Sequence, residues 1–112
     1  MYRIYVDDLR PTPDDSYDKH CYTTNETLNC IRKQYKAGVR QFFLDLDNDT
    51  TLDTDGRKGG DFINILNTID NLTYTGKFTN TQFYIRIHTG NCVARDKMRL
   101  IIKYNPSMSE IY

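Results

Sequence analysis

The sequence predicts a small α/β domain in which helices and a mostly parallel sheet form a three-layer sandwich. Three apolar, strand-like segments, residues 4–8, 42–47 and 84–89, each end in residues that bind metal ions or phosphate. Segments with helical spacing of apolar residues separate them. Strands that alternate with helices favour right-handed crossovers and a parallel sheet. In such sheets ligands bind beyond the carboxyl ends of the strands.

The length and charge of the chain exclude several classes of protein. It has 112 residues, with 15 basic and 15 acidic side chains, so we expect a single domain over residues 1–112 and no non-specific nucleic-acid binding. No apolar run approaches the ~20 residues that span a membrane. The first residues read directly as a strand, so we expect no signal peptide. Three widely spaced cysteines favour reduced thiols, so we expect a cytoplasmic protein.

The first part of the chain contains two strand signals. Residues 2–7 alternate in side-chain polarity and are rich in Ile, Val and Tyr, and this pattern predicts a strand. The proline-containing segment 9–15 cannot continue this strand, because proline lacks a donor and has a fixed φ. Residues 20–23 predict a short second strand.

A helix and a buried strand follow. Thr24 or Asn25 is expected to cap a helix that Gly38 ends, with an apolar stripe that includes Leu28, Ile31 and Tyr35. Residues 40–46 contain a continuous apolar run, which predicts a strand that is buried on both faces.

The rest of the chain repeats this pattern. Gly60-Asp61 is expected to open a second helix, residues 71–81 to form a loop, and residues 82–88 to form the third strong strand. Asn91 is expected to cap a last helix that ends at residues 105–107, and the tail has room for one short element. The apolar residues of this last helix are Val93, Met98, Leu100, Ile101 and Ile102.

Asp7 and Asp8 follow the first strand. Neighbouring side chains on a strand point to opposite faces, so both reach one site only where the chain bends, and the nearby prolines favour such a bend. Carboxylates of this kind bind Mg²⁺ together with waters and phosphate. The alternative is a solvated acidic turn.

Asp45 and Asp47 end the central strand and, at a spacing of two, lie on the same side of it. One metal ion can contact both. Asp45 can also act as a phospho-acceptor nucleophile or a general base, with Asp47 as its helper. Alternatively, Asp47 only caps the following loop.

His88-Thr89-Gly90-Asn91 connects the third strong strand to the start of a helix, where free N–H groups favour anions. His88 is a candidate general acid or base, or a metal ligand. Thr89 can donate to a phosphoryl oxygen, and Arg95 can pair with phosphate in a bidentate manner. The alternative is a structural histidine.

Several motifs match one known family in the right order over nearly the whole chain. They are Asp7-Asp8-Leu9-Arg10-Pro11-Thr12-Pro13, Leu44-Asp45-Leu46-Asp47, Gly60-Asp61-Phe62 and His88-Thr89-Gly90-Asn91 with Arg95 and Met98. The chain resembles the cyclic-phosphate processing receiver domains, relatives of two-component receivers. The resemblance implies a flavodoxin- or receiver-like fold, a Mg²⁺ site at Asp7 and Asp8, a phosphoryl site at Asp45 contacted by Thr89, and metal-assisted processing of cyclic phosphate esters.

Two departures from the family pattern affect these expectations. The family has a histidine between the two aspartates of the central strand, where this chain has Leu46. Ordinary receivers carry a lysine after a fifth strand, and we expect this chain to be truncated at that strand–helix unit. The missing lysine disfavours phosphorelay signalling, and Leu46 leaves His88 as the proton-transfer histidine.

Three functional hypotheses follow. The first is a phosphoesterase with Mg²⁺ or Mn²⁺ at Asp7, Asp8, Asp45 and Asp47, and with Asp45 and His88 as catalytic residues. Its substrate is a cyclic nucleotide or another phosphorylated small molecule, bound by Arg10, Thr89, Asn91 and Arg95. The second is a module that binds such a ligand without converting it. The third is a receiver-like protein-interaction domain.

Overall fold

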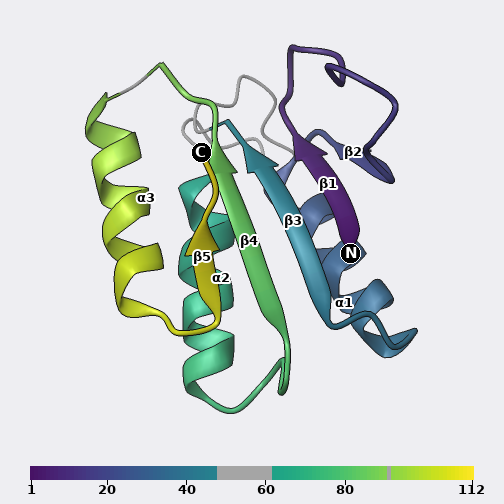
Figure 1. The fold of residues 1–112 in the computed structure, drawn as a ribbon, viewed down its shortest axis with the longest axis vertical. Coiled ribbons are helices and arrows are strands. Elements are labelled where there is room, and N and C mark those ends of the chain that lie inside the picture. The colour runs from purple at the N-terminus through teal and green to yellow at the C-terminus, as the bar shows by residue number, and fades with distance from the viewer. Residues whose placement is uncertain (48–61, 91) are drawn as a thin grey trace.

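The computed structural model describes residues 1–47, 62–90 and 92–112 (Figure 1). Its elements are β1 (Tyr2–Val6), β2 (Lys19–Cys21), α1 (Thr24–Lys36), β3 (Gln41–Leu46), α2 (Ile63–Tyr74), β4 (Gln82–Ile87), α3 (Cys92–Tyr104) and β5 (Met108–Glu110). The strands form one sheet in the order β2-β1-β3-β4-β5, and every described pair is parallel. The predicted receiver-like α/β fold with a parallel sheet is confirmed.

The described helices all pack on one face of the sheet (Figure 1). The connections β2–β3, β3–β4 and β4–β5 all run in one direction across the sheet, and right-handed crossovers in one direction place their helices on the same side. The connection from β1 to β2 runs the other way but contains no helix. The described residues therefore form two layers, the sheet and the helices on one of its faces.

The core lies between this helical layer and the sheet. Alternate strand residues such as Ile4, Leu44 and Ile85 point into it, together with Ile31, Leu66 and Met98 from the helices. Leu46 is also fully buried in this core. Leu46 therefore faces the helices, on the side of β3 opposite to Asp45.

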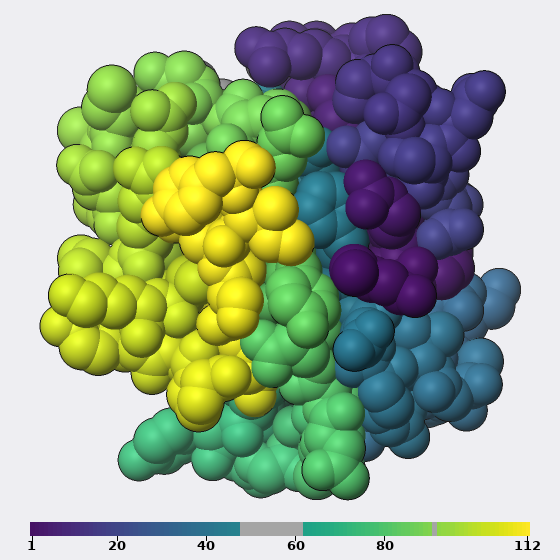
Figure 2. All heavy atoms as spheres, in the orientation of Figure 1, coloured from purple at the N-terminus to yellow at the C-terminus, as the bar shows by residue number. Residues whose placement is uncertain are grey.

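The other side, which we call the open face, carries Arg3, Tyr5, Phe43 and Asp45 and is the side seen in Figure 2. The β1–β2 connection covers part of it through Tyr17. Phe43 is only 4% exposed, because the guanidinium of Arg3 lies 4.3 Å from its ring and the ring of Tyr17 lies 6.2 Å away. This small aromatic cluster brings the hydroxyl group of Tyr17 to Asp45.

Both ends of α1 are defined by local hydrogen bonds. Thr23, and not the predicted Thr24 or Asn25, is the N-cap, because its Oγ1 accepts the N–H of Glu26 at 3.1 Å. At the other end, the predicted stop at Gly38 is confirmed. Gly38 has φ +104°, and the N–H of Val39 returns to the carbonyl of Gln34 at 3.0 Å, as in a Schellman motif.

The end of α2 differs from the prediction, and α3 buries only some of its apolar residues. Residues 71–74 belong to α2 and not to a loop, because the helix continues until Gly76 adopts φ +86°. In α3 the buried residues are Ala94, Met98 and Ile102, spaced four apart. Val93 and Leu100 are 65% and 56% exposed, so these two apolar residues of the helix lie outside its buried stripe. The predicted helix start at residues 60–61 and the predicted cap at Asn91 lie outside the described residues.

We predicted that the chain is truncated at the C-terminal strand–helix unit, but the strand of that unit is present as β5. β5 pairs with β4 in parallel, with Met108 beside Phe83, and buries Met108 in the core. The predicted end of α3 at residues 105–107 is confirmed, since this segment forms the turn into β5. None of the helices within the described ranges is long and apolar enough to cross a membrane.

The left-handed backbone at Gly38 gives a test of this fold. Gly38→Ala is expected to lower the free energy of unfolding by about 1–2 kcal/mol, since no atom lies within 4 Å of the new Cβ and only backbone strain is added. Gly90 is the matched control, because its added Cβ also meets no atom but its φ lies outside the left-handed range. Urea unfolding of both variants measures the difference, and equal losses would contradict the argument.

Candidate functional site

The candidate site lies at the carboxyl edge of the three central strands. Asp7 directly follows β1, Asp47 directly follows β3, and His88 directly follows β4. The backbone ladder continues through them, since Asp7 donates to the Cys21 carbonyl at 3.2 Å, Asp47 to that of Val6 at 3.0 Å and His88 to that of Leu46 at 2.9 Å. These bonds hold the three residues in fixed positions relative to the sheet.

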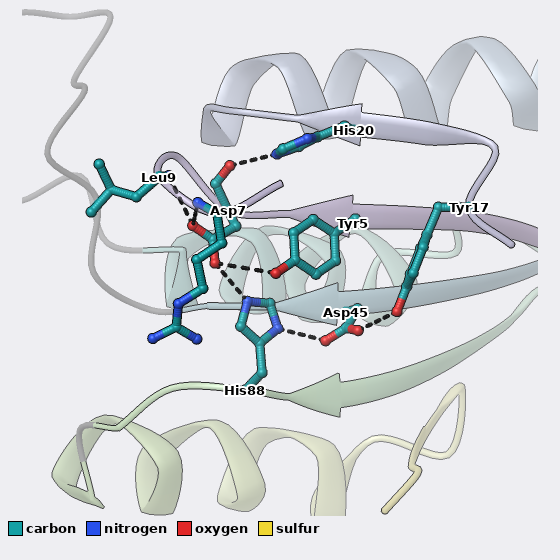
Figure 3. Close-up of polar contacts among 8 residues, drawn as sticks. Tyr5, Asp7, Leu9, Tyr17, His20, Asp45 and His88 are labelled. Atoms are coloured by element: carbon teal, nitrogen blue, oxygen red, sulfur yellow. Dashed lines mark hydrogen bonds and ion pairs between the residues drawn. The ribbon is translucent and has the colours of Figure 1, made fainter. Parts of the chain in front are cut away.

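His88 connects two carboxylates across the open face (Figure 3). Its Nδ1 lies 2.5 Å from Oδ1 of Asp45, and its Nε2 lies 3.0 Å from Oδ2 of Asp7. The ring stacks on Tyr5, with 5.0 Å between centroids and 2° between planes. We call this arrangement the His88 bridge. Burial alone lowers the pKa of His88, but the hydrogen bonds and charges of Asp45 and Asp7 outweigh it and raise that pKa.

Asp7 is fully buried and held by its own turn. Its Oδ1 accepts the N–H groups of Leu9 and Arg10, both at 2.9 Å, which leaves Oδ2 facing His88. Burial acts to raise the pKa of Asp7, but these two N–H groups and His88 more than compensate and lower it. Asp7 is therefore a fixed, ionised carboxylate.

Asp45 uses both of its oxygens. Oδ1 contacts His88, and Oδ2 accepts the hydroxyl of Tyr17 at 2.5 Å (Figure 3). Burial, followed by the hydrogen bond and charge of Asp45, raises the pKa of Tyr17, so the phenol stays a neutral donor. A carboxylate with both oxygens occupied is suited to orienting His88. It is poorly placed to attack a phosphoryl group.

Three side chains meet the spacing of a metal site. One ligand atom from each of Asp7, Asp47 and His88 lies within 4.8 Å of the other two. Two carboxylates and an imidazole are an appropriate ligand set for a divalent cation. Of the four carboxylates predicted as ligands, the structure brings Asp7 and Asp47 together in this Asp7–Asp47–His88 group. Asp8 is the next residue after Asp7 and is also buried, and Asp45 contacts Nδ1 of His88, but neither carboxylate belongs to the group.

The predicted phosphate-binding residues differ in exposure and in what they contact. Arg10 has an exposed side chain and follows the Asp7 turn. Thr89 is buried, and the guanidinium of Arg95 donates to its carbonyl oxygen at 2.5 Å. Asn91 lies outside the described residues.

Three residues of the site were missed by sequence reasoning. Tyr5 lies two residues before Asp7, so strand alternation alone places it on the same face. His20, to which no role was assigned, is the register partner of Tyr5 and donates from Nε2 to the carbonyl of Asp7 at 2.7 Å. Tyr17 lies in an irregular connection, and no sequence pattern indicates its contact with Asp45.

Comparison with known proteins identifies a family. A family model described as "Cyclic-phosphate processing Receiver domain" matches residues 2–104. The matched range runs from β1 to the end of α3 and contains every residue of the His88 bridge. No curated protein and no solved structure matches the chain.

The His88 bridge predicts how stability depends on pH in metal-free protein. The folded pKa of His88 is raised above 6.5, so its contribution is complete below pH 6.5 and is lost as the pH rises through the folded pKa. The folded pKa of Asp7 is lowered below 3.8, so its contribution is present above pH 3.8 and is lost as the pH falls through that lower value. Both contributions are therefore present between pH 3.8 and pH 6.5.

Urea unfolding in EDTA tests this prediction. We expect the free energy of unfolding of the wild type to fall as the pH rises above 6.5, and that of His88→Gln to fall less. Parallel profiles for the two proteins would show that the bridge does not stabilise the fold.

Proposed function

The chain belongs to the cyclic-phosphate processing receiver domain family, and we propose that it processes a cyclic phosphate ester with a divalent metal ion held by Asp7, Asp47 and His88. The observation that supports this most strongly is the convergence of three ligand atoms within 4.8 Å from three adjacent strands. Oxygen-rich sites of this kind suit Mg²⁺ or Mn²⁺. An ion bound there would polarise a phosphoryl oxygen and lower the pKa of a coordinated water.

The residues of the chain prepare the ligand set. Asp45 holds the Nδ1–H of His88, which directs Nε2 toward Asp7. A carboxylate on the far nitrogen of a histidine ligand fixes its tautomer and makes it a better donor. Tyr17 in turn holds Asp45, and the Leu9 and Arg10 amides hold Asp7. In this proposal Asp45 is a positioning residue, its predicted role as a metal ligand passes to Asp7, Asp47 and His88, and a coordinated water would be the nucleophile in its place.

The substrate phosphate needs a cationic partner beside this group. Arg10 is the best candidate, because its side chain is exposed and its backbone is fixed by the carboxylate of Asp7. Arg95 is better suited to positioning, since its guanidinium holds the Thr89 carbonyl at the start of α3. We therefore propose Arg10 as the phosphate-binding residue and Arg95 as support for the β4–α3 turn.

A second candidate function is binding of the same ligand without conversion. Both ring nitrogens of His88 and both oxygens of Asp45 are already hydrogen-bonded. General acid–base catalysis requires a group that can exchange a proton with the substrate. If these bonds persist with ligand bound, the site holds the phosphate and leaves it intact.

Titration calorimetry with MnCl₂ and MgCl₂ tests the metal site. We expect one ion per chain, loss of binding in Asp47→Asn, and an affinity about 10–100-fold lower in Asp45→Asn, which removes only the support of His88. Asp15→Asn is the matched control, because it removes an exposed carboxylate of the β1–β2 connection. Equal affinity in Asp45→Asn and Asp15→Asn would contradict the positioning role.

Incubation with a panel of 2′,3′- and 3′,5′-cyclic nucleotides in the presence of Mn²⁺ tests the reaction. We expect a linear phosphate monoester, and a rate at least about 100-fold lower in His88→Gln. Recovery of unchanged, protein-bound ligand would favour the binding module. Neither binding nor conversion of any member of the panel would refute both candidates.

A further inference from the structure

A pocket lies at the opposite end of the strands from the Asp7–Asp47–His88 group. It has a volume of about 350 Å³ and is formed by the last turns of α1, the end of α2 and the α2–β4 connection. In Figure 1 this connection is at the lower end of the sheet, where β4 begins. We propose that the pocket binds a small organic phosphate with a flat apolar body, such as an aryl phosphate monoester. This inference does not depend on the proposed function.

The floor of the pocket is apolar and includes Phe78 and Leu72. Phe78 is 8% exposed and packs edge-on against Phe83, with 5.6 Å between centroids, and against Tyr35, at 5.1 Å. Its φ of +53° is uncommon for a bulky residue. The contacts with the core hold Phe78 in this conformation, so the floor is fixed in the absence of a ligand.

Tyr35 forms a wall that is fixed in the same way. The guanidinium of Arg40 lies 4.0 Å from the centroid of its ring, and its hydroxyl shares a hydrogen bond of 3.1 Å with Oγ1 of Thr79. Pockets whose aromatic surfaces are already ordered lose less entropy when a ligand binds. A flat ring in the ligand therefore meets prepared apolar surfaces at the floor and the wall.

The rim is cationic. Arg32 and Lys36 lie one helical turn apart on α1, and Lys77 comes from the α2–β4 connection. Among the described residues that line the pocket, none is acidic. Three cations around an apolar floor complement a ligand that combines a flat body with a dianion. The volume also falls in the usual range for small-molecule pockets, which begins at roughly 300 Å³.

The three cations have one other physical explanation, and the test must distinguish it from ligand binding. Lys36 lies in the last turn of α1, where a positive charge complements the helix dipole. Arg32 lies before that turn, and Lys77 lies beyond the end of α2. The dipole explanation therefore applies directly to Lys36 alone, and it predicts an effect on stability without ligand binding.

Calorimetry on the full chain, with EDTA present to keep metal from the other site, tests the proposal. The probes are 2-naphthyl phosphate, 2-naphthol, which lacks the charge, and inorganic phosphate, which lacks the ring. We expect one 2-naphthyl phosphate per chain, bound at least about tenfold more tightly than either other probe. Asp47→Asn is expected to leave this affinity unchanged, because the two sites are at opposite ends of the strands.

Two double variants provide the matched comparison. Lys36→Gln with Lys77→Gln is expected to weaken binding about tenfold, and Lys97→Gln with Lys103→Gln, two exposed lysines of α3, to leave it unchanged. Equal affinity for 2-naphthol and 2-naphthyl phosphate, or unchanged affinity in the first double variant, would overturn the proposal. Absence of 2-naphthyl phosphate binding to the wild type, together with lower thermal stability of that variant, would also overturn it, because Lys36 would then only complement the end of α1.

Discussion

The hydrogen bonds of His88 to Asp7 and Asp45 are the interaction on which the candidate site depends. They join β1, β3 and β4 across the open face and place one imidazole between two buried carboxylates. Buried charges are tolerated only when they are paired and hydrogen-bonded. The bridge meets that condition for Asp7 and Asp45. It also sets which nitrogen of His88 faces Asp7. Stability and ligand geometry at this edge therefore have the same physical origin.

The one-sided packing of the helices explains how the bridge is supported. Because the described helices lie on one face, the open face is free to receive the β1–β2 connection. Tyr17 from that connection packs near Phe43 and reaches Asp45. A helix in its place would present a different set of side chains to Asp45. The same topology directs Leu46 into the core, on the side of β3 opposite to Asp45.

The differences between prediction and structure all arise where packing or a local hydrogen bond decides between close alternatives. Thr23, Thr24 and Asn25 are all acceptable N-caps by residue type, and only the bond to Glu26 selects Thr23. In α3, Val93 and Leu100 are as apolar as Met98, but only residues that face the sheet become buried. The short β5 was not recognised because a three-residue strand is defined by its partner β4 more than by its own sequence.

The sequence by itself determined the parallel α/β architecture and the position of the site, because strand alternation and polar strand ends are local patterns. It placed Asp7, Asp45, Asp47 and His88 at one edge of the sheet. Only the tertiary structure decided which partner each of these side chains faces. Asp45 turns to Tyr17 and one nitrogen of His88, and Asp47 joins Asp7 at the metal-site spacing. The reason is that side-chain direction depends on contacts between residues far apart in the chain, and Tyr17 lies 28 residues from its partner Asp45.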